Sequence, residues 1–383
     1  MKKIYFDFAS TTFVRDEVLE AMIPYFKENF GNPSSLHSFG QSALTGIDLA
    51  REKIKNILNA ESLKEIIFTS SATESNNLAI KGLAFYFYLF KKIKPHFITS
   101  SIEHPSVLEV MADLEEMEII ETTYLKPEKN SLIDPEKIKN EIKENTFLVS
   151  LHYVNSELGT VQKIKEISKI LKEINQERKE KIYFHTDAAQ AGFENLDVQD
   201  LGIDLMTLSS HKIYGPKGIA LLYVRKGIPL VKLISGSEQE YNLRAGTEAV
   251  PLIVGFAKAM ELIEKEKEKI DNHLKEVRDY FLNKIKDFKG KIILNTIPEI
   301  SSPKILNLYF PTKSSQELLI YLDTNGVAVS AGTACKSRAN EPSYIVSDIY
   351  GQERSKNSLR LSFGITNKKE EIDYVIDLLK KFL

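Results

Sequence analysis

A lysine at the apex of a polar turn is the residue of this sequence with the clearest chemical potential. Lys212 follows His211 in LMTLSSHKIYGPKGIALLYV, residues 205–224, where two apolar runs bracket a turn that contains glycine and proline. The two runs predict buried strands. An ammonium between them would lose solvation, which favours the neutral, nucleophilic amine that a Schiff base requires. The alternative is a solvated lysine on a surface loop, which is the commoner environment of lysine.

Polar clusters that directly follow short β-prone runs supply further candidates. Ala72 and Thr73 open a predicted helix, where hydroxyl and backbone N–H groups favour a phosphate, although such a pattern is more often a plain helix start. Asp187 ends the run IYFHTD, and a carboxylate there needs a cationic partner, such as a pyridinium nitrogen. His104 in SIEHPS could stack on an aromatic ring, act as an acid or base, or be a hydrogen-bonded loop histidine.

The chain has one cysteine, Cys335, which excludes an intrachain disulfide framework and an all-cysteine metal site. A lone cysteine is most often a small buried hydrophobe. The surrounding SAGTACKSRANEP is rich in small, polar and basic residues, which predicts a mobile, electropositive loop that stabilises a thiolate. Cys335 is therefore a candidate nucleophile.

The composition is that of an ordinary globular protein. The 383 residues are 43% hydrophobic and 27% charged, with a formal net charge of -2, which favours neither nucleic acid nor an anionic membrane as a partner. The N-terminal apolar run is interrupted by Asp7, so we expect no signal peptide. The longest other apolar run, residues 83–90, is far shorter than the roughly 20 residues of a membrane span. We expect a soluble, cytoplasmic protein of two or three domains.

Strands and helices alternate along the first two thirds of the chain. The predicted strands cover residues 66–70, 97–100, 119–125, 147–154, 182–187 and 204–210. This alternation predicts an α/β fold, with a mostly parallel sheet between helices and a ligand site at the carboxyl ends of the strands. From Phe256 to Phe288 the apolar spacing predicts one long amphipathic helix. The rest predicts a smaller α/β domain with an antiparallel sheet. We place a large domain at 15–255 and a small domain at 1–14 and 256–383.

Taken together, the motifs resemble those of the class V aminotransferase superfamily of fold type I pyridoxal-phosphate enzymes. Within it, they are most similar to the cysteine desulfurases that supply sulfur for iron-sulfur clusters. The resemblance covers nearly the whole chain, and its most specific parts are SSHKIYGPKG and the GTAC loop with EPSY downstream. The other matching stretches are YFDFASTT, FGNPSS, FTSSATESNNLAIKG, EHPSV, HYVNSELGTVQ, FHTDAAQ, LRAGT and SLRLSFG.

The resemblance implies how the cofactor, pyridoxal 5'-phosphate, is held. Lys212 would carry it as a Schiff base, His104 would stack on its ring, and Asp187 would pair with the pyridine nitrogen. Gln190 would bond the phenolic oxygen. The phosphate would be held by Ala72, Thr73, Ser209, His211 and, from a second subunit, Thr247.

The resemblance also implies the substrate and the reaction. Asn155 and Arg360 would bind the carboxylate of L-cysteine, for which the planar fork of arginine is suited. Cys335 would attack the substrate sulfur and hold it as a persulfide, and L-alanine would be released. A homodimer is implied, and so is a sulfur-acceptor protein, either an iron-sulfur scaffold or a tRNA-thiolation enzyme. No metal is expected.

Two stretches depart from the family pattern. SGSEQEYNLRAGT, residues 235–247, stands where a Gly-rich GGxQExGxRxGT is usual, and Lys336 and Arg338 follow the cysteine where smaller polar residues are common. Two alternatives also stay open. One is a class V aminotransferase or selenocysteine lyase on the same scaffold, which needs no loop cysteine. The other is a non-catalytic ligand-binding or scaffold protein that keeps the fold.

Overall fold

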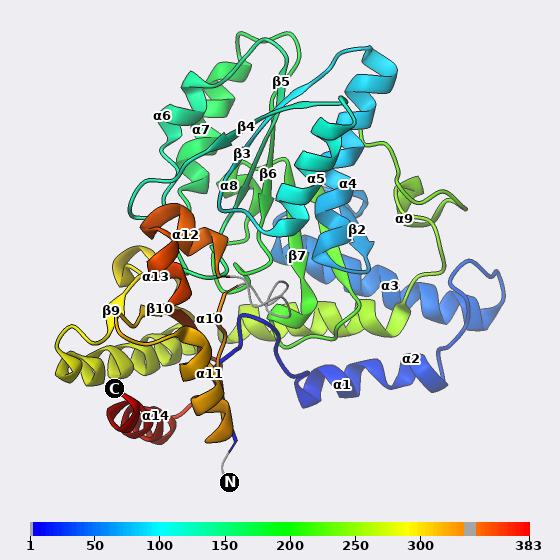
Figure 1. Cartoon of the computed structure of the whole chain (residues 1–383). Helices are drawn as coiled ribbons and strands as arrows, with labels where there is room; N and C mark the ends of the chain where they lie inside the picture. Colours follow the sequence, from blue (N-terminus) through cyan, green and yellow to red (C-terminus); the bar gives the residue numbers. More distant parts are fainter. Residues whose placement is uncertain (1–2, 333–341) are drawn as a thin grey trace.

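A seven-stranded sheet forms the centre of the computed structural model, which describes residues 3–332 and 342–383 (Figure 1). Its strand order is β2-β8-β7-β6-β5-β3-β4, and β8 runs antiparallel to both of its neighbours while the other pairs are parallel. The mostly parallel sheet is thereby confirmed. The strands are β2 (Ile66–Thr69), β3 (His96–Ser100), β4 (Glu121–Leu125), β5 (Thr146–His152), β6 (Tyr183–Asp187), β7 (Leu205–Ser209) and β8 (Ala220–Val224).

Helices cover both faces of this sheet, because successive side chains of each strand point to opposite sides. Ile67 and Leu222 pack in one apolar cluster, together with residues of α4 and α5. Their neighbours Ile66 and Leu221 pack in another, together with residues of α3, α7 and α10. The helices of the first 240 residues are α1 (Asp16–Met22), α2 (Pro24–Lys27), α3 (Ser38–Ile57), α4 (Ala72–Phe85), which continues as a π-helix (Tyr86–Lys91), α5 (Pro105–Glu116), α6 (Pro135–Asn140), α7 (Ile164–Asn175), α8 (Val198–Leu201) and α9 (Gln239–Asn242).

The long helix is confirmed as α10 (Val250–Ile285), which spans 36 residues and begins before the predicted Phe256. It lies along α3 in one half of the molecule and reaches α14 (Lys369–Phe382) in the other (Figure 1). Helix α10 therefore contacts both the helices that cover the seven-stranded sheet and the C-terminal region.

The C-terminal region has its own three-stranded antiparallel sheet, as predicted, in the order β12-β10-β9. Beside this sheet, β11 (Val327–Ala328) pairs in parallel with β1 (Ile4–Tyr5) of the N-terminal arm, and Ser330, two residues further on, forms an antiparallel bridge with Arg360 of β12. The domain limits 15–255 and 1–14 plus 256–383 stay a prediction. The remaining elements are β9 (Ile293–Leu294), β10 (Ile305–Tyr309), α11 (Ser315–Thr324), α12 (Tyr344–Tyr350), α13 (Gln352–Lys356) and β12 (Ser358–Ser362).

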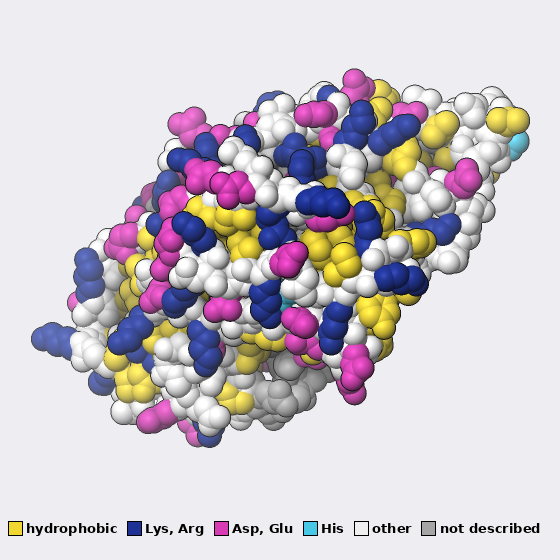
Figure 2. All heavy atoms as spheres, turned by 90° about the horizontal axis from the view of Figure 1, so that it is seen from above, with side chains coloured by type: hydrophobic (Ala, Val, Ile, Leu, Met, Phe, Trp, Pro, Cys, Tyr) yellow, Lys and Arg dark blue, Asp and Glu magenta, His cyan; other side chains and the backbone are white. Residues whose placement is uncertain are grey.

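The surface shows mixed charge. On the face in Figure 2, basic and acidic side chains are interspersed with small apolar patches, the pattern of a solvated surface rather than a phosphate-binding stripe. Within residues 3–332 and 342–383, no helix combines the length and apolar character that a membrane crossing requires.

Candidate active site

A cavity of about 250 Å³ lies at the carboxyl ends of the parallel strands, where the fold class predicts a ligand site. It brings together ten of the residues singled out from the sequence. They come from the start of α4, the turn before α5, the segments that follow β5, β6 and β7, and strand β12. These residues are Ala72, Thr73, His104, Asn155, Asp187, Gln190, Ser209, His211, Lys212 and Arg360.

Lys212 lines this cavity from a single 3₁₀ turn that follows β7, and it is half-buried rather than solvated on a surface loop. Its Nζ donates to the carbonyl oxygens of Ala9 at 2.6 Å and Ser10 at 2.8 Å. The N-terminal arm thus holds the amine at the cavity wall. Sequence reasoning did not foresee this contact, because about 200 residues separate the arm from Lys212.

Asp187 lies at the end of β6 and is 7% exposed. One carboxylate oxygen accepts from the backbone N–H of Ala189 at 2.9 Å, and the other accepts from Nδ2 of Asn76 at 2.8 Å. Asn76 was missed in the sequence. The available signal was an asparagine inside a predicted helix, a position that asparagine seldom favours.

His104 caps the N-terminus of α5 and lines the cavity, so the loop-histidine interpretation and a functional one are compatible. Its Nδ1 accepts from the backbone N–H of Ser106 at 3.1 Å, and the Ser106 hydroxyl lies 2.8 Å from the same nitrogen. Ser106, which also lines the cavity, was another residue that sequence reasoning did not select.

The wall of the cavity at the start of α4 suits an anion. Helix α4 begins at Ala72, and the N–H groups of its first turn have no acceptor within the helix. Ser209, at the end of β7, and His211, in the turn that follows, line the same cavity. Burial, followed by the positive charges of Lys212, Lys217 and Lys304, lowers the pKa of His211 to about 4. A neutral His211 would therefore bind an anion through a ring N–H.

Arg360 closes the cavity from β12 and is only 3% exposed. One terminal nitrogen donates to Oδ1 of Asp7 at 2.8 Å and to Oγ of Ser10 at 2.7 Å, and the other donates to the Ser156 carbonyl at 2.8 Å. Its Nε has no partner in the described part of the chain. The guanidinium is held rigidly by three of its five N–H groups, which leaves the Nε–H and one hydrogen of the second terminal nitrogen.

Asn155 has a structural role that the sequence did not show. Its Oδ1 accepts from the backbone N–H groups of Glu157 and Leu158 at 3.0 and 2.9 Å, and its Nδ2 donates to the Ile102 carbonyl at 3.2 Å. The side chain fixes the loop after β5, and only its second amide hydrogen remains for a bound group.

Lys304 is a buried cation that sequence reasoning overlooked. It is 1% exposed, its Nζ donates to the Lys212 carbonyl oxygen at 3.1 Å, and it lies 5.3 Å from the centroid of the Phe193 ring. Burial, then the charges of Lys212 and Arg360, lowers the pKa of Lys304 to about 7. Its signal was a lysine directly before the apolar run ILNLYF.

Two predicted site residues remain to be accounted for. Cys335 belongs to residues 333–341, outside the described part of the chain, as do Lys336 and Arg338. Thr247 is exposed and does not line the cavity of its own chain. It follows α9, the segment that departs from the Gly-rich family pattern.

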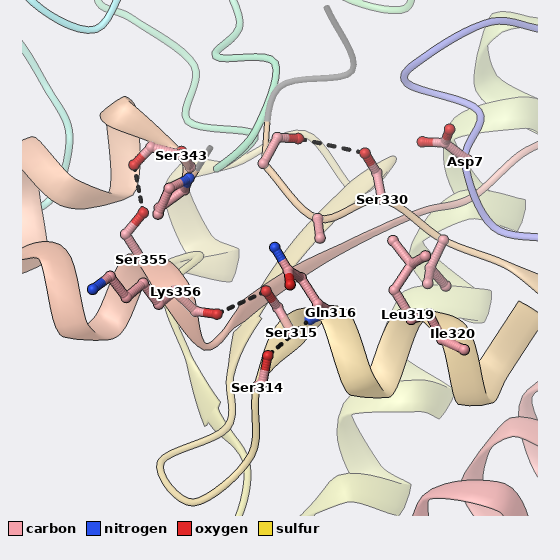
Figure 3. Close-up of a pocket in the computed structure, with 14 residues that line it drawn as sticks. Asp7, Ser314, Ser315, Gln316, Leu319, Ile320, Ser330, Ser343, Ser355 and Lys356 are labelled. Atoms are coloured by element: carbon pink, nitrogen blue, oxygen red, sulfur yellow. Dashed lines mark hydrogen bonds between the residues drawn. The ribbon is translucent and has the colours of Figure 1, made fainter. Parts of the chain in front are cut away.

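A second, larger cavity of about 680 Å³ lies between α11, α12 and α13 (Figure 3). It is rich in serine hydroxyls, among them Ser315, which donates to the Lys356 carbonyl at 2.7 Å. Gly332 and Pro342, at the two ends of the undescribed segment, both line it, and so does Asp7. Because Asp7 pairs with Arg360, the two cavities adjoin each other at this ion pair.

The chain belongs to the aminotransferase class-V family, whose family model matches residues 4–375. A cysteine desulfurase IscS of Dictyoglomus turgidum is 44% identical over 384 residues, which covers 100% of this chain and 95% of that protein. Among solved structures, a NifS-like protein superposes with a TM-score of 0.91 at 34% identity and full coverage of both chains. SspA in complex with cysteine has a TM-score of 0.79 and 38% identity, covering 94% of this chain and 99% of SspA. The predicted fold type I is confirmed.

Enzymes of this family depend on pyridoxal phosphate, and the cavity fits that group. Gln190 donates to the Ala9 carbonyl at 2.8 Å, but its buried Oε1 has no partner in the described chain. Buried polar atoms without partners are costly, so the cavity is suited to a polar ligand. The carboxylate of Asp187 matches a ring nitrogen, the amine of Lys212 an aldehyde, and the start of α4 a phosphate.

Proposed function

We propose that this protein is a pyridoxal-phosphate-dependent cysteine desulfurase, which converts L-cysteine to L-alanine and holds the sulfur as a persulfide on Cys335. The observation that carries the proposal is that one cavity joins Lys212, Asp187 and Arg360. Full-length relatives that are named cysteine desulfurase IscS, and the similarity to SspA in complex with cysteine, support L-cysteine as the substrate.

Four polar side chains of the cavity would have roles in this reaction. When bound, pyridoxal phosphate stabilises the negative charge that develops on the substrate's α-carbon. Asp187 would hold the proton of the ring nitrogen. Arg360 would pair with the substrate carboxylate, since Asp7 and Ser10 fix the orientation of its guanidinium. Lys212 would take the proton from the α-carbon, and His104, at the cavity wall, would exchange a proton with the substrate.

Cys335 would accept the sulfur. Its thiolate forms a bond to the substrate sulfur while the carbon-sulfur bond breaks, and the electron pair of that bond stays with carbon, which is then protonated to give alanine. The chain before the undescribed segment supports this role. Ser330 exchanges two backbone hydrogen bonds with Arg360, at 3.1 and 2.7 Å, so the stretch leading to Cys335 starts beside the residue that would bind the substrate.

The working assembly in this proposal is a cytoplasmic homodimer in which Thr247 of each chain reaches the phosphate of the other. Its persulfide would pass to an acceptor protein, either an iron-sulfur scaffold or a tRNA-thiolation enzyme.

Replacing Cys335 with serine tests the proposal. The Cys335→Ser variant should bind the cofactor and show its visible absorbance but release no sulfide from cysteine. Mass spectrometry of wild-type protein treated with cysteine should find one added sulfur on the peptide with Cys335. Sulfide release by Cys335→Ser would overturn the mechanism.

The same protein preparations distinguish a cysteine desulfurase from the alternative functions. An aminotransferase would consume an amino donor and form a 2-oxo acid without any persulfide. A selenocysteine lyase would release selenide from selenocysteine while leaving cysteine intact. A non-catalytic protein would remain colourless and take up no added pyridoxal phosphate.

A further inference from the structure

We propose that Asn76 and Ser106 are positioning residues that couple His104 to Asp187 through one buried chain of hydrogen bonds with a fixed direction. The inference rests on the proposed function, because His104 and Asp187 are the residues expected at the face and at the nitrogen of the cofactor ring. It assigns roles to two side chains that lie within matching stretches of the sequence but have no role in the proposed mechanism.

The chain of hydrogen bonds links three elements. Asn76 lies one turn into α4 and is 0% exposed, and Ser106, at the start of α5, is 8% exposed. Nδ2 of Asn76 is 2.8 Å from Oδ2 of Asp187 and 2.8 Å from Oγ of Ser106. Oγ of Ser106 is in turn 2.8 Å from Nδ1 of His104. The chain therefore runs without a break from the end of β6 to the cap of α5.

Each donor and acceptor in this chain follows from elementary chemistry. The carboxylate of Asp187 can only accept, so the amide nitrogen of Asn76, with its two hydrogens, must face it. The second amide hydrogen points to the Ser106 hydroxyl. At the other end, the backbone N–H of Ser106 can only donate, and it donates to Nδ1 of His104 at 3.1 Å. Nδ1 therefore carries no hydrogen, and the Ser106 hydroxyl donates to it.

This direction determines what His104 can do. Its ring proton lies on Nε2, because Nδ1 accepts from the N–H and the hydroxyl of Ser106. Asp187 accepts one hydrogen bond from Asn76 and another from the Ala189 N–H. Together these two hydrogen bonds fix the plane of its carboxylate. The tautomer of the histidine and the orientation of the carboxylate are set by the same two side chains.

A role of Asn76 in packing alone does not explain these contacts. Its Oδ1 is buried and has no partner within residues 3–332 and 342–383. An apolar side chain of similar volume would avoid that unpaired oxygen. What the amide adds at this position is the pair of N–H groups directed at Asp187 and Ser106.

The first test uses apo-protein with ¹⁵N-labelled histidine. Long-range ¹H–¹⁵N correlation spectra distinguish a proton on Nδ1 from one on Nε2, and His104→Gln identifies the resonances of His104 among the seven histidines. We expect the Nε2–H tautomer in the wild type. Asn76→Ala and Ser106→Ala should each shift the Nδ1 resonance. A proton on Nδ1 in the wild type would overturn the proposed direction.

The second test measures release of pyridoxal phosphate from the holoenzyme. Asn76→Ala should release it about tenfold faster or more, because Asp187 loses a charge-assisted donor. Asn77→Ala is the matched control, since Asn77 is the next residue of α4 and donates instead to the Thr73 carbonyl, at 2.9 Å. Ser106→Thr keeps the hydroxyl and should keep the wild-type His104 resonance.

Unchanged Nδ1 resonance and unchanged release in Asn76→Ala would refute the coupling. If that variant does not fold, Ser106→Ala, which removes a single oxygen, decides in its place. Neither readout involves turnover, so the two failures are distinguishable. A failure of the coupling leaves the Nδ1 resonance and the release rate of the variants at the wild-type values, whereas a failure of the desulfurase proposal leaves the wild-type protein without sulfide release from cysteine.

Discussion

Lys304 is a second lysine next to the one that would carry the cofactor, with its buried amine bonded to the Lys212 carbonyl oxygen. Burial, and then the charges of Lys212 and Arg360, lowers the pKa of Lys304 from 10.5 to about 7. Between these two pH values the unfolded chain binds a proton that the folded chain does not, so this residue makes stability rise with pH across that window. Below pH 7 Lys304 is protonated in both the folded and the unfolded chain, and the full cost of burying its charge then lowers the free energy of unfolding.

Lys304→Met should therefore stabilise the apo-protein at pH 7, by about 2 kcal/mol, and the gain should shrink toward pH 10. Urea unfolding at several pH values measures the difference. Lys94→Met, at an exposed lysine, should leave the pH dependence as it is. A loss of stability of equal size at every pH would show instead that the hydrogen bond to the Lys212 carbonyl outweighs the burial of the amine.

Helix α9 shows how one element replaces the glycines that the family pattern leads one to expect. Glu240, Tyr241 and Asn242 all have left-handed backbone angles, with φ of 46°, 55° and 64°. Asparagine tolerates this region better than most residues, which explains Asn242 at a position where glycine is usual. The sequence therefore differs from the family pattern here, but the backbone has a left-handed turn that glycine could also adopt.

The left-handed turn of α9 is held by a buried ion pair. The two carboxylate oxygens of Glu240 accept from Arg51 at 2.7 and 2.9 Å, and one of them also accepts from the Phe68 N–H at 2.8 Å. The guanidinium of Arg51 lies over the rings of Phe68 and Tyr241, at 4.7 and 5.1 Å. Helix α3, strand β2 and helix α9 are thus fixed to one another just before Thr247.

Arg51→Met should destabilise the protein by about 3–5 kcal/mol, because it leaves a buried carboxylate without its cation. Adding Glu240→Gln to that variant should restore part of the loss, and urea unfolding of the two single variants and the double variant measures the coupling. Additive effects of the two changes would contradict a buried pair that acts as a unit.

At the level of the whole molecule, the active-site cavity depends on chain segments from both ends. The N-terminal arm supplies the acceptors for Lys212 and the carboxylate for Arg360, and it is held by the pairing of β1 with β11. Arg360 itself comes from the C-terminal sheet. Thr247, exposed in a single chain, would add a contribution from a second copy.

Light scattering should therefore give a mass of twice 43.5 kDa for the holoenzyme. Thr247→Val should weaken pyridoxal phosphate binding by about tenfold through the lost hydroxyl, with the mass and the apo-protein stability unchanged. A monomeric holoenzyme with unaltered affinity in this variant would contradict the shared site.

The sequence by itself determined the sheet, the long helix and most of the cavity wall, because these depend on local patterns. Apolar runs specify buried strands, and in a parallel sheet the residues that follow them meet at one edge. Lys212, Asp187 and His104 could be selected for that reason. Cys335 could be selected by its neighbours in the chain, and its position lies outside the described residues.

The tertiary structure decided which side chains support these residues. Asn76 contacts Ser106 and Asp187, and Lys304 contacts Lys212, although each pair is far apart in the sequence, and a single sequence records no such pairing. The carbonyls of Ala9 and Ser10 became acceptors for Lys212 only because the arm folds back across the turn. Local spacing therefore singled out Lys212 as the candidate reactive amine, while distant segments determined its hydrogen-bond partners.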